Sequence, residues 1–373
     1  TGVQTCALPI LKILQLNYQQ KIDELKATKE IPGLNINSEY GQFNSIYRDY
    51  KIGIDKNISY IFKNKIKEEL IHNNIIDLKN QKDINLLEYK KRVSTLFSDW
   101  IYLFNKDRLL RKMDSLFNIL TIQAEVMLKT GTIELLQLSI IEQQKMQLNT
   151  NLKENENLLL QTENKIKLHF KNAGSFIPYV NINEDTILQI KVNLIAEHPE
   201  LKLMDSRINS LKQQYKLINF NNFPELSLGY NIMTMQGMGA DNLIYNNKFN
   251  FNWLQLSLLI PLEFEKNHHL KKASLLRQQI TLLEKIQLFN YLESDLRLTL
   301  KSFINAKTTF LHYLNKVKPQ TESLFNQIQL KLNKGEIDFA NWLILYQSII
   351  SIQIDYLNAI RNYYIQKSNL TYL

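Results

Sequence analysis

Cysteine, proline and glycine are scarce in this chain of 373 residues, which contains one, seven and ten of them respectively. With a single cysteine the chain cannot hold an internal disulfide framework. Neither glycine nor proline occurs between Gly53 and Gly131, and only Pro261 and Pro319 interrupt the stretch from Gly239 to Gly335. Such long stretches without helix breakers exceed ordinary globular helices and indicate a coiled coil or a helical barrel.

Long apolar runs are also missing. No run of 18 or more apolar residues occurs, so the sequence predicts no membrane-spanning helix. The only cysteine, Cys6, lies in residues 1–10, whose composition differs from the Asn-, Lys-, Ile- and Leu-rich sequence behind them. We interpret residues 1–10 as a non-native, adapter-like leader and exclude them from the prediction. A helix predicted over 11–29 starts directly behind them, so we expect an upstream segment to be missing.

The sequence shows few motifs for catalysis, metal binding or nucleic-acid binding. The net charge is +9, but lysines alternate with Glu, Gln and Asn along helical segments, as in residues 64–69, which is typical of a solvated helix face rather than a nucleic-acid footprint. No phosphate-binding loop, nucleophile motif or His–carboxylate constellation occurs. His268 and His269 diverge on a helix, and the methionines at 233, 235 and 238 form a loop between strands. We therefore expect no enzyme, no cofactor, no metal site and no nucleic-acid partner.

The sequence contains an internal repeat. Residues 128–137, LKTGTIELLQ, return as LNKGEIDFAN at 332–341, which makes Gly131 and Gly335 equivalent. Upstream, PGLNI at 32–36 corresponds to PELSL at 224–228. Each half contains two alternating stretches, a long helix, a glycine turn and another long helix. A duplicated unit of this kind indicates repeat architecture.

Four stretches alternate apolar and polar residues with a period of two, as half-buried strands do. The apolar positions of the first hairpin, about 34–60, are Leu34, Ile36, Tyr40, Tyr50, Ile52, Ile54, Ile58 and Tyr60; those of the second, about 225–262, are Leu226, Leu228, Tyr230, Ile232, Leu254, Leu256, Leu258 and Ile260. Phe251 and Trp253 alternate in the opposite phase, which predicts a bulge near Trp253.

Two structures explain such strands. One is a sheet that covers a soluble core; the other is a barrel wall with lipid outside and water inside. Periodicity alone favours the soluble sheet, but the long helices shift the balance toward the barrel. Because barrel width grows with strand number, four strands cannot enclose a water-filled channel. The membrane interpretation therefore requires several copies to pool their strands.

The last helix, predicted over 337–370, has two apolar seams. One carries Phe339, Leu343, Tyr346, Ile350, Gln353, Leu357, Ile360 and Tyr364; the other carries Trp342, Leu345, Ile349, Ile352, Tyr356, Ala359 and Tyr363. Spacings of four and three along the first seam follow the coiled-coil heptad. Two adjacent seams allow a helix to contact a neighbour on each side, as staves of a cylinder do. Pro319 is expected to break or kink the helix before it, and Pro199 to open a helix.

These stretches resemble the TolC family of bacterial outer-membrane efflux channels. The second tip and closing helix correspond to residues 335–360, the first tip to 128–136, the two hairpin entries to 39–49 and 223–230, and the start of the second repeat to HPEL at 198–201. The resemblance covers nearly all of 11–373 and is greatest to the heavy-metal, RND-type branch of Bacteroidetes-like bacteria. It implies a mainly α fold with β-hairpins in two repeats, 11–197 and 198–373. Long helices are expected at about 61–126, 132–172, 265–332 and 337–370.

The resemblance also implies a function and its residues. It implies a homotrimer in the outer membrane, with a shared twelve-stranded barrel and a periplasmic helical tunnel, that passively exports metal ions or small molecules. Its partners would be the bilayer, a periplasmic adaptor and an inner-membrane RND pump. Adaptor contacts fall on Thr130, Gly131, Thr132, Lys334, Gly335 and Glu336; the constriction on Glu134, Gln137, Asp338 and Asn341; the lipid-facing surface on Ile52, Ile54, Ile58, Leu226, Leu228, Leu254, Leu256 and Leu258. The amides at 137 and 341 argue against a strongly acidic ring. The alternative is a soluble coiled-coil scaffold or periplasmic adaptor.

Overall fold

The computed structural model describes residues 9–27, 31, 33–43, 46–169, 192–246, 248 and 250–373. The chain divides into two compact units. The helical unit consists of Thr1–Ile13, Ile84–Val192 and Tyr291–Leu373, and the sheet unit of Leu14–Asp83 and Asn193–Asn290. Each unit takes segments from both predicted repeats, so the division at residue 197 stays a prediction. Most of the proposed leader, residues 1–8, lies outside the described residues, as do Pro32 and residues 170–191.

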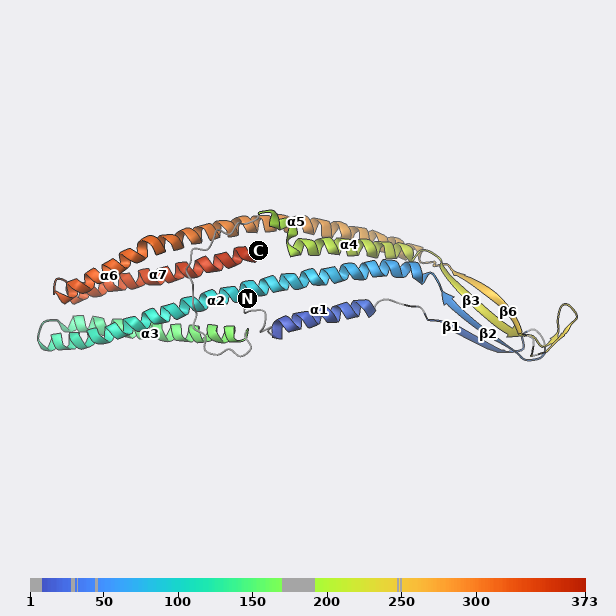
Figure 1. Cartoon of the computed structure of the whole chain (residues 1–373), viewed down its shortest axis with the longest axis horizontal. Helices are drawn as coiled ribbons and strands as arrows, with labels where there is room; N and C mark the ends of the chain where they lie inside the picture. Colours follow the sequence, from blue (N-terminus) through green and yellow to red (C-terminus); the bar gives the residue numbers. More distant parts are fainter. Residues whose placement is uncertain are drawn as a thin grey trace. The chain divides into compact units, whose positions relative to one another are not determined.

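Long helices dominate the fold, as the scarcity of glycine and proline predicts. They are α1 (Pro9–Ala27), α2 (Tyr60–Lys129), α3 (Leu135–Lys167), α4 (Pro199–Phe220), α5 (Phe264–His312), α6 (Lys318–Asn333) and α7 (Phe339–Thr371), with a 3-10 turn, η2, at Val192–Glu197. Figure 1 shows α3 lying along the C-terminal part of α2, and α7 lying along α6. As expected, α4 opens with Pro199, and the Nδ1 atom of His198 accepts a hydrogen bond from the Glu200 backbone N–H at 3.3 Å.

A four-stranded antiparallel sheet forms the end of the sheet unit. Its strands are β1 (Asn35–Gly41), β2 (Asp49–Asn57), β3 (Glu225–Thr234) and β6 (Asn250–Leu259), in the order β1-β2-β3-β6 (Figure 1). The two predicted hairpins therefore join through β2 and β3, and β1 and β6 are the edge strands. A small hairpin of β4 (Gly237–Met238) and β5 (Ile244–Tyr245) connects β3 to β6.

The predicted bulge near Trp253 is wrong. β3 and β6 pair without interruption from Glu225 opposite Leu259 to Thr234 opposite Asn250. Trp253 lies opposite Asn231, and its ring centroid is 5.8 Å from the Lys51 Nζ atom. Phe251 packs edge-on against Tyr245 at 5.1 Å between centroids. The aromatic side chains thus find partners on the other face of the sheet, and no change of register is needed.

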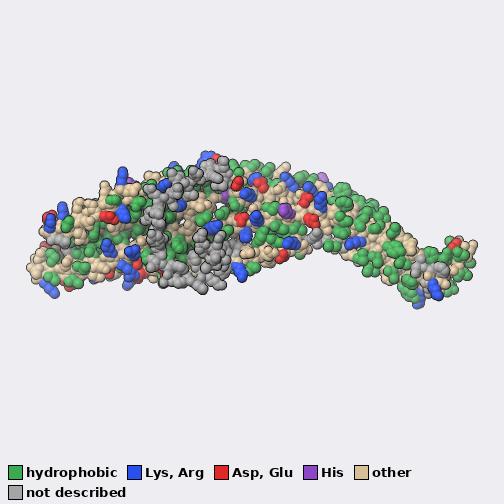
Figure 2. Space-filling view, viewed as in Figure 1, with side chains coloured by type: hydrophobic (Ala, Val, Ile, Leu, Met, Phe, Trp, Pro, Cys, Tyr) green, Lys and Arg blue, Asp and Glu red, His purple; other side chains and the backbone are tan. Residues whose placement is uncertain are grey.

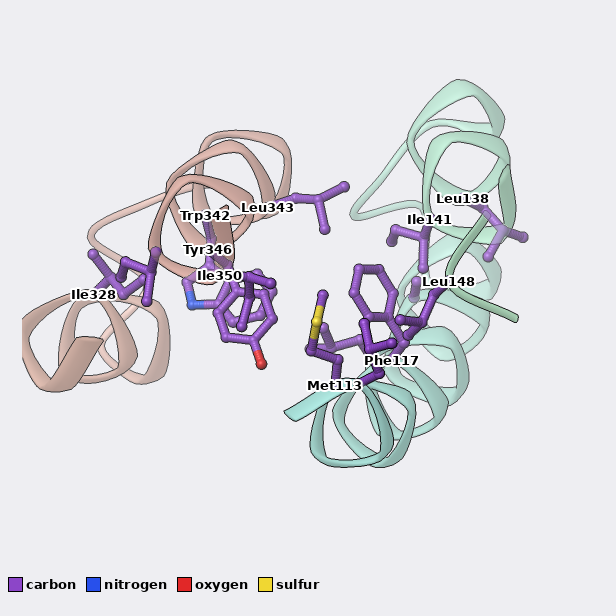
Figure 3. Packing of buried hydrophobic residues seen from close by; sticks show 14 residues of the cluster. Met113, Phe117, Leu138, Ile141, Leu148, Ile328, Trp342, Leu343, Tyr346 and Ile350 are labelled. Carbon is purple, nitrogen blue, oxygen red and sulfur yellow. The ribbon is translucent and has the colours of Figure 1, made fainter. Parts of the chain in front are cut away.

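A buried apolar core packs behind the two helix turns of the helical unit. Its buried members come from four helices: Leu110, Met113, Phe117, Leu120 and Ala124 from α2, Leu138, Ile141 and Leu148 from α3, Ile328 from α6, and Trp342, Leu343, Tyr346, Ile349 and Ile350 from α7. In Figure 3, Met113 and Phe117 face Tyr346 and Ile350 across the core. The rings of Trp342 and Tyr346 stack at 4.9 Å between centroids. Burial raises the pKa of Tyr346 to about 12.

One helix meets the length and composition of a membrane span. Within the described part of the chain it is the segment Asn341–Thr371 of α7, although the sequence contains no long uninterrupted apolar run. The core helix of a globular protein has the same length and composition. The side chains of Trp342, Leu343 and Tyr346 are almost fully buried within the protein core. Packing in the helical unit therefore accounts for these three residues of α7, whereas Ile344 and Leu345 are exposed.

The predicted interruption at Pro319 takes the form of a π-helical turn. Tyr313–Val317 adopts this wider turn between α5 and α6, and Pro319 follows in the first turn of α6. Proline lacks a backbone N–H and its ring crowds the preceding helical turn. A π turn inserts a residue and moves the hydrogen-bond ladder, so the helix continues instead of ending.

We expect Ile141→Ala to destabilise the helical unit by about 2–5 kcal/mol, because a nearly fully buried side chain leaves a cavity. The matched control is Ile140→Ala, the same substitution one residue earlier on α3. Ile141 is 1% exposed and Ile140 is 37% exposed. Thermal unfolding followed by circular dichroism measures both. Equal effects of the two substitutions would contradict the core described above.

Candidate functional sites in the sheet and at the helix turns

The sheet exposes an apolar face. Ile36, Ile54, Tyr230 and Leu254 lie opposite one another on the four strands and form one row on this face. All four side chains are exposed, and Leu254 is 74% exposed. Figure 2 shows hydrophobic side chains over much of the strand region on the face in view. A sheet that covers a soluble core does the reverse, with its apolar face inward.

The residues predicted to face lipid lie on this surface with two qualifications. Ile52, Ile54, Leu228, Leu254, Leu256 and Leu258 are exposed. Leu226, which lies opposite Leu258, is half-buried. Ile58 is also half-buried and follows the end of β2, where its N–H donates to the Leu226 carbonyl at 2.8 Å. Contact of any of these residues with lipid stays a prediction.

The opposite face of the sheet is polar and internally hydrogen-bonded. The side-chain amides of Asn35 and Asn37 donate to the two carboxylate oxygens of Asp55 at 3.1 and 3.2 Å. On the next strands Asn231 donates to Gln255 at 2.8 Å. Asn57 donates to Glu225 at 2.8 Å, and Lys51 pairs with Glu39 at 3.2 Å. Many polar side chains of this face therefore bond to one another.

Close packing on the polar face requires glycine at one position. A Cβ atom on Gly53 would lie 2.2 Å from the Asn231 Oδ1 atom, which is far inside van der Waals contact. The Asn231 side chain therefore occupies the space above Gly53, where it is 6% exposed. The alternation Lys-Ile-Gly-Ile-Asp in β2 thus serves two purposes, with large apolar side chains on one face and room for a neighbouring amide on the other.

A polar contact at one end of the sheet was missed by the sequence analysis. Asp49 and Thr234 are 0% and 1% exposed. The Thr234 hydroxyl donates to Asp49 Oδ1 at 3.2 Å and accepts from the Tyr50 N–H at 3.1 Å. The pair is separated by 185 residues. No local pattern signals it, because it depends on the pairing of β2 with β3.

The two helix turns have the same backbone hydrogen bonds. After α2, the N–H of Gly131 donates to the Leu128 carbonyl at 3.1 Å and that of Thr132 to Met127 at 2.8 Å. After α6, Gly335 donates to Leu332 at 3.0 Å and Glu336 to Lys331 at 2.9 Å. The φ angles of Gly131 and Gly335 are 72° and 71°. Both turns are Schellman motifs, which require a residue in the left-handed conformation.

Both turns also lead into a helix with a side-chain cap. Before α3, the Glu134 N–H donates to the Gln137 Oε1 atom at 3.2 Å. Before α7, Asp338 accepts from the backbone N–H and the side-chain amide of Asn341 at 2.8 and 2.6 Å. The four residues predicted to line a constriction therefore have a local role as helix caps. Their position in a constriction stays a prediction.

The residues predicted to contact an adaptor lie together at these turns. Thr130, Gly131, Thr132, Lys334, Gly335 and Glu336 are all exposed. The Thr130 and Thr132 hydroxyls are 2.9 Å apart, and the Lys334 amine is 4.0 Å from the Glu336 carboxylate. The two turns thus have the same backbone conformation but differ in their exposed side chains. Contact of these residues with an adaptor stays a prediction.

Metal ligands do not gather in the described part of the chain, where no group of three or more His, Cys, Asp or Glu residues is placed to hold an ion. The His268 and His269 rings lie edge to face at 5.7 Å between centroids.

Solved structures share this fold. CusC, whose structure was described with transmembrane channel formation, has a TM-score of 0.78 at 13% identity over 97% of this chain and 88% of that chain. The outer membrane protein VceC from Vibrio cholerae has 0.71 at 11% identity, over 97% and 90%. The open-state outer membrane channel MtrE from Neisseria gonorrhoeae has 0.74 at 12% identity, over 98% and 85%.

No protein-family model matches the sequence, and no curated protein does. The likeness therefore lies in the fold. The predicted resemblance to TolC-family channels is confirmed at that level, including a mainly helical chain with a few strands.

We expect Gly335→Ala to destabilise the second turn by about 1–2 kcal/mol, because a Cβ atom strains a left-handed residue. Gly335→Asn should cost less, since asparagine tolerates this conformation. Gly335→Pro should be the most damaging, because proline cannot adopt the φ of 71° and removes the N–H that donates to Leu332.

The matched control is Gly33→Ala, because Gly33 is not among the positive-φ glycines and a Cβ atom there meets nothing within 4 Å. Thermal unfolding gives the stabilities, and limited proteolysis locates the loosened turn. If Gly335→Ala and Gly335→Pro unfolded at the temperature of Gly33→Ala, the role assigned to the Schellman turn would be incorrect.

Proposed function

We propose that this chain is the outer-membrane channel, or exit duct, of a tripartite efflux system. Three copies would each contribute four strands to a twelve-stranded barrel, and their helices would form a tunnel in the periplasm. The channel would passively export metal ions or small molecules and convert nothing. An RND pump in the inner membrane would supply the energy and select the substrate.

The exposure of the apolar face of the sheet is the single observation that carries this proposal. Its apolar face, with Ile54, Leu254 and Leu256, is exposed, while Asn231 on the polar face is buried. Transfer of apolar surface out of water is favourable by about 25 cal/mol per Å², so a face of this kind calls for an apolar environment. Alternating residues that are apolar outside and polar inside are the pattern of transmembrane barrel strands.

The sheet edges support pooling by several copies. β1 and β6 each pair with a single strand in the sheet of one chain. In a bilayer, unsatisfied backbone groups are expensive, so only closed barrels or helices span it. Pairing of β6 of one copy with β1 of the next would remove both edges. The shared fold with CusC, VceC and MtrE, over 85% or more of each of those chains, also supports the proposal.

The two turns are proposed as the periplasmic tips. Thr130, Thr132, Lys334 and Glu336 would contact the adaptor, and the helices beyond them would move to open the tunnel. The described turns are well suited to this role because each is a short, exposed connection on a rigid helical core.

The test compares Leu256→Arg with Gln255→Arg, neighbours in β6 on opposite faces of the sheet. We expect Leu256→Arg to reduce insertion strongly, because an arginine facing lipid costs about 2–4 kcal/mol at the bilayer midplane. Gln255→Arg, facing the polar interior, should insert and assemble as the unchanged chain does. Detergent extraction from outer-membrane fractions and gel electrophoresis without heating measure insertion and trimer formation.

The alternative, a soluble coiled-coil scaffold or adaptor, predicts a different outcome. The unchanged chain would then be recovered in the soluble fraction as a monomer, and both arginine variants would behave alike. Loss of efflux in Gly335→Pro with normal insertion would in addition assign the turn to the periplasmic side of the mechanism. Retained efflux in that variant, in cells without their own channel, would count against the proposed tip.

A further inference from the structure

A cavity of about 310 Å³ lies within the helical unit beside the π-helical turn. It is lined by α2, by α6 with the last residue of the turn, and by α7. The volume falls at the lower end of the range of small-molecule sites, about 300–1,000 Å³. π-Helical turns occur frequently at functional sites. The cavity is remote in sequence from both helix turns and from the strands, so the proposed function does not use it.

Part of the cavity lining is apolar, beside the polar side chains of Asn105, Thr321 and Gln353. Leu109 from α2 and Ile352 from α7 are half-buried and line it together with Leu357. These side chains offer an apolar surface to the body of a ligand. A ligand that fits must therefore carry a compact apolar group.

The rim of the cavity is cationic. Arg108, Lys112 and Lys318 line it with one carboxylate, Glu322, which gives three positive charges against one negative charge. None of the three cations forms an ion pair with a described residue. The Lys112 amine lies 6.0 Å from the Phe325 ring centroid and the Lys318 amine 5.9 Å from that of Tyr356. Cation–π contacts hold an amine near the rim without neutralising it.

Tyr356 adds an unused hydrogen-bond donor. It lines the cavity, and its hydroxyl oxygen is buried without a hydrogen-bond partner among the residues that the structure describes. Burial, and then the charge of Glu322, raise the pKa of this hydroxyl, so it stays protonated. Leaving a buried hydroxyl unpaired costs about 1–3 kcal/mol. An oxygen acceptor that entered the cavity would remove this penalty.

We propose that this cavity binds a small amphipathic organic anion, with its carboxylate or sulfonate near Tyr356 and Lys318 and its apolar body against Leu109 and Ile352. A cation would meet three positive side chains, and a neutral apolar molecule would leave the hydroxyl unpaired. The site depends on the helical unit alone. It therefore does not require that the sheet spans a membrane.

The experiment uses the full chain in a non-ionic detergent and measures binding of 2-naphthalenesulfonate by isothermal titration calorimetry. The uncharged 2-naphthalenesulfonamide is the matched ligand. We expect the sulfonate to bind at one site per chain and the sulfonamide to bind about tenfold more weakly. A tenfold change corresponds to about 1.4 kcal/mol, the size of a charge-assisted hydrogen bond.

Two substitutions test the contacts, and each has a control nearby in the chain. Tyr356→Phe removes only the hydroxyl and should weaken sulfonate binding about tenfold; Tyr364→Phe, on the same helix outside the cavity, should change it less than twofold. Lys318→Gln should weaken binding about threefold or more, and Lys316→Gln in the π turn should not. Circular dichroism confirms that each variant is folded.

The proposal is overturned by any of three results with folded protein. These are equal affinity for the charged and uncharged ligands, unchanged sulfonate affinity in both Tyr356→Phe and Lys318→Gln, or no saturable binding to the unchanged chain. The last result would mean that water satisfies the Tyr356 hydroxyl. Because insertion into a membrane is measured separately, failure here leaves the proposed channel untouched.

Discussion

An apolar sheet face exposed on one side and a hydrogen-bonded polar face on the other place the strongest constraint on this chain. On the polar face, Asn231 fits above Gly53 and the amides of Asn35 and Asn37 bond to Asp55, so these groups are paired within the sheet itself. The apolar face cannot remain in water without a large unfavourable hydration term. The sheet therefore needs an apolar surrounding, and its two edge strands need partners. In the proposed channel, the bilayer would surround the apolar face, and strands of neighbouring copies would pair with the two edges.

The helical unit supports two exposed turns at the ends of long helices. The same Schellman hydrogen bonds close both turns, and buried side chains from α2, α3, α6 and α7 meet directly behind them. The repeated sequence thus gives the same backbone conformation and hydrogen bonds at Gly131 and Gly335. The outward side chains have diverged, with threonines at one turn and a Lys–Glu pair at the other. A partner that contacts both turns would meet two different surfaces.

The sequence predicted those features that depend on neighbouring residues. Long intervals without glycine or proline predicted the helices to within a few residues, and period-two alternation predicted the four strands and most of their exposed apolar side chains. Features that depend on distant segments were missed. The alternation around Trp253 suggested a bulge, yet the pairing with β3 is continuous because Lys51 and Tyr245 supply partners for the aromatic rings. The Asp49–Thr234 contact and the cavity beside the π turn likewise need the folded chain.

Helix capping changes how the acidic residues at the turns should be understood. Both carboxylate oxygens of Asp338 accept hydrogen bonds from Asn341, one from the backbone and one from the side-chain amide. A carboxylate in this state is anchored at the positive end of the α7 dipole. Unwinding of the first turn of α7 would release the carboxylate and leave helix N–H groups unpaired in the same step. In the proposed channel, the charge presented at the tip is therefore coupled to the integrity of the helix start, which a free acidic side chain at the same position could not achieve.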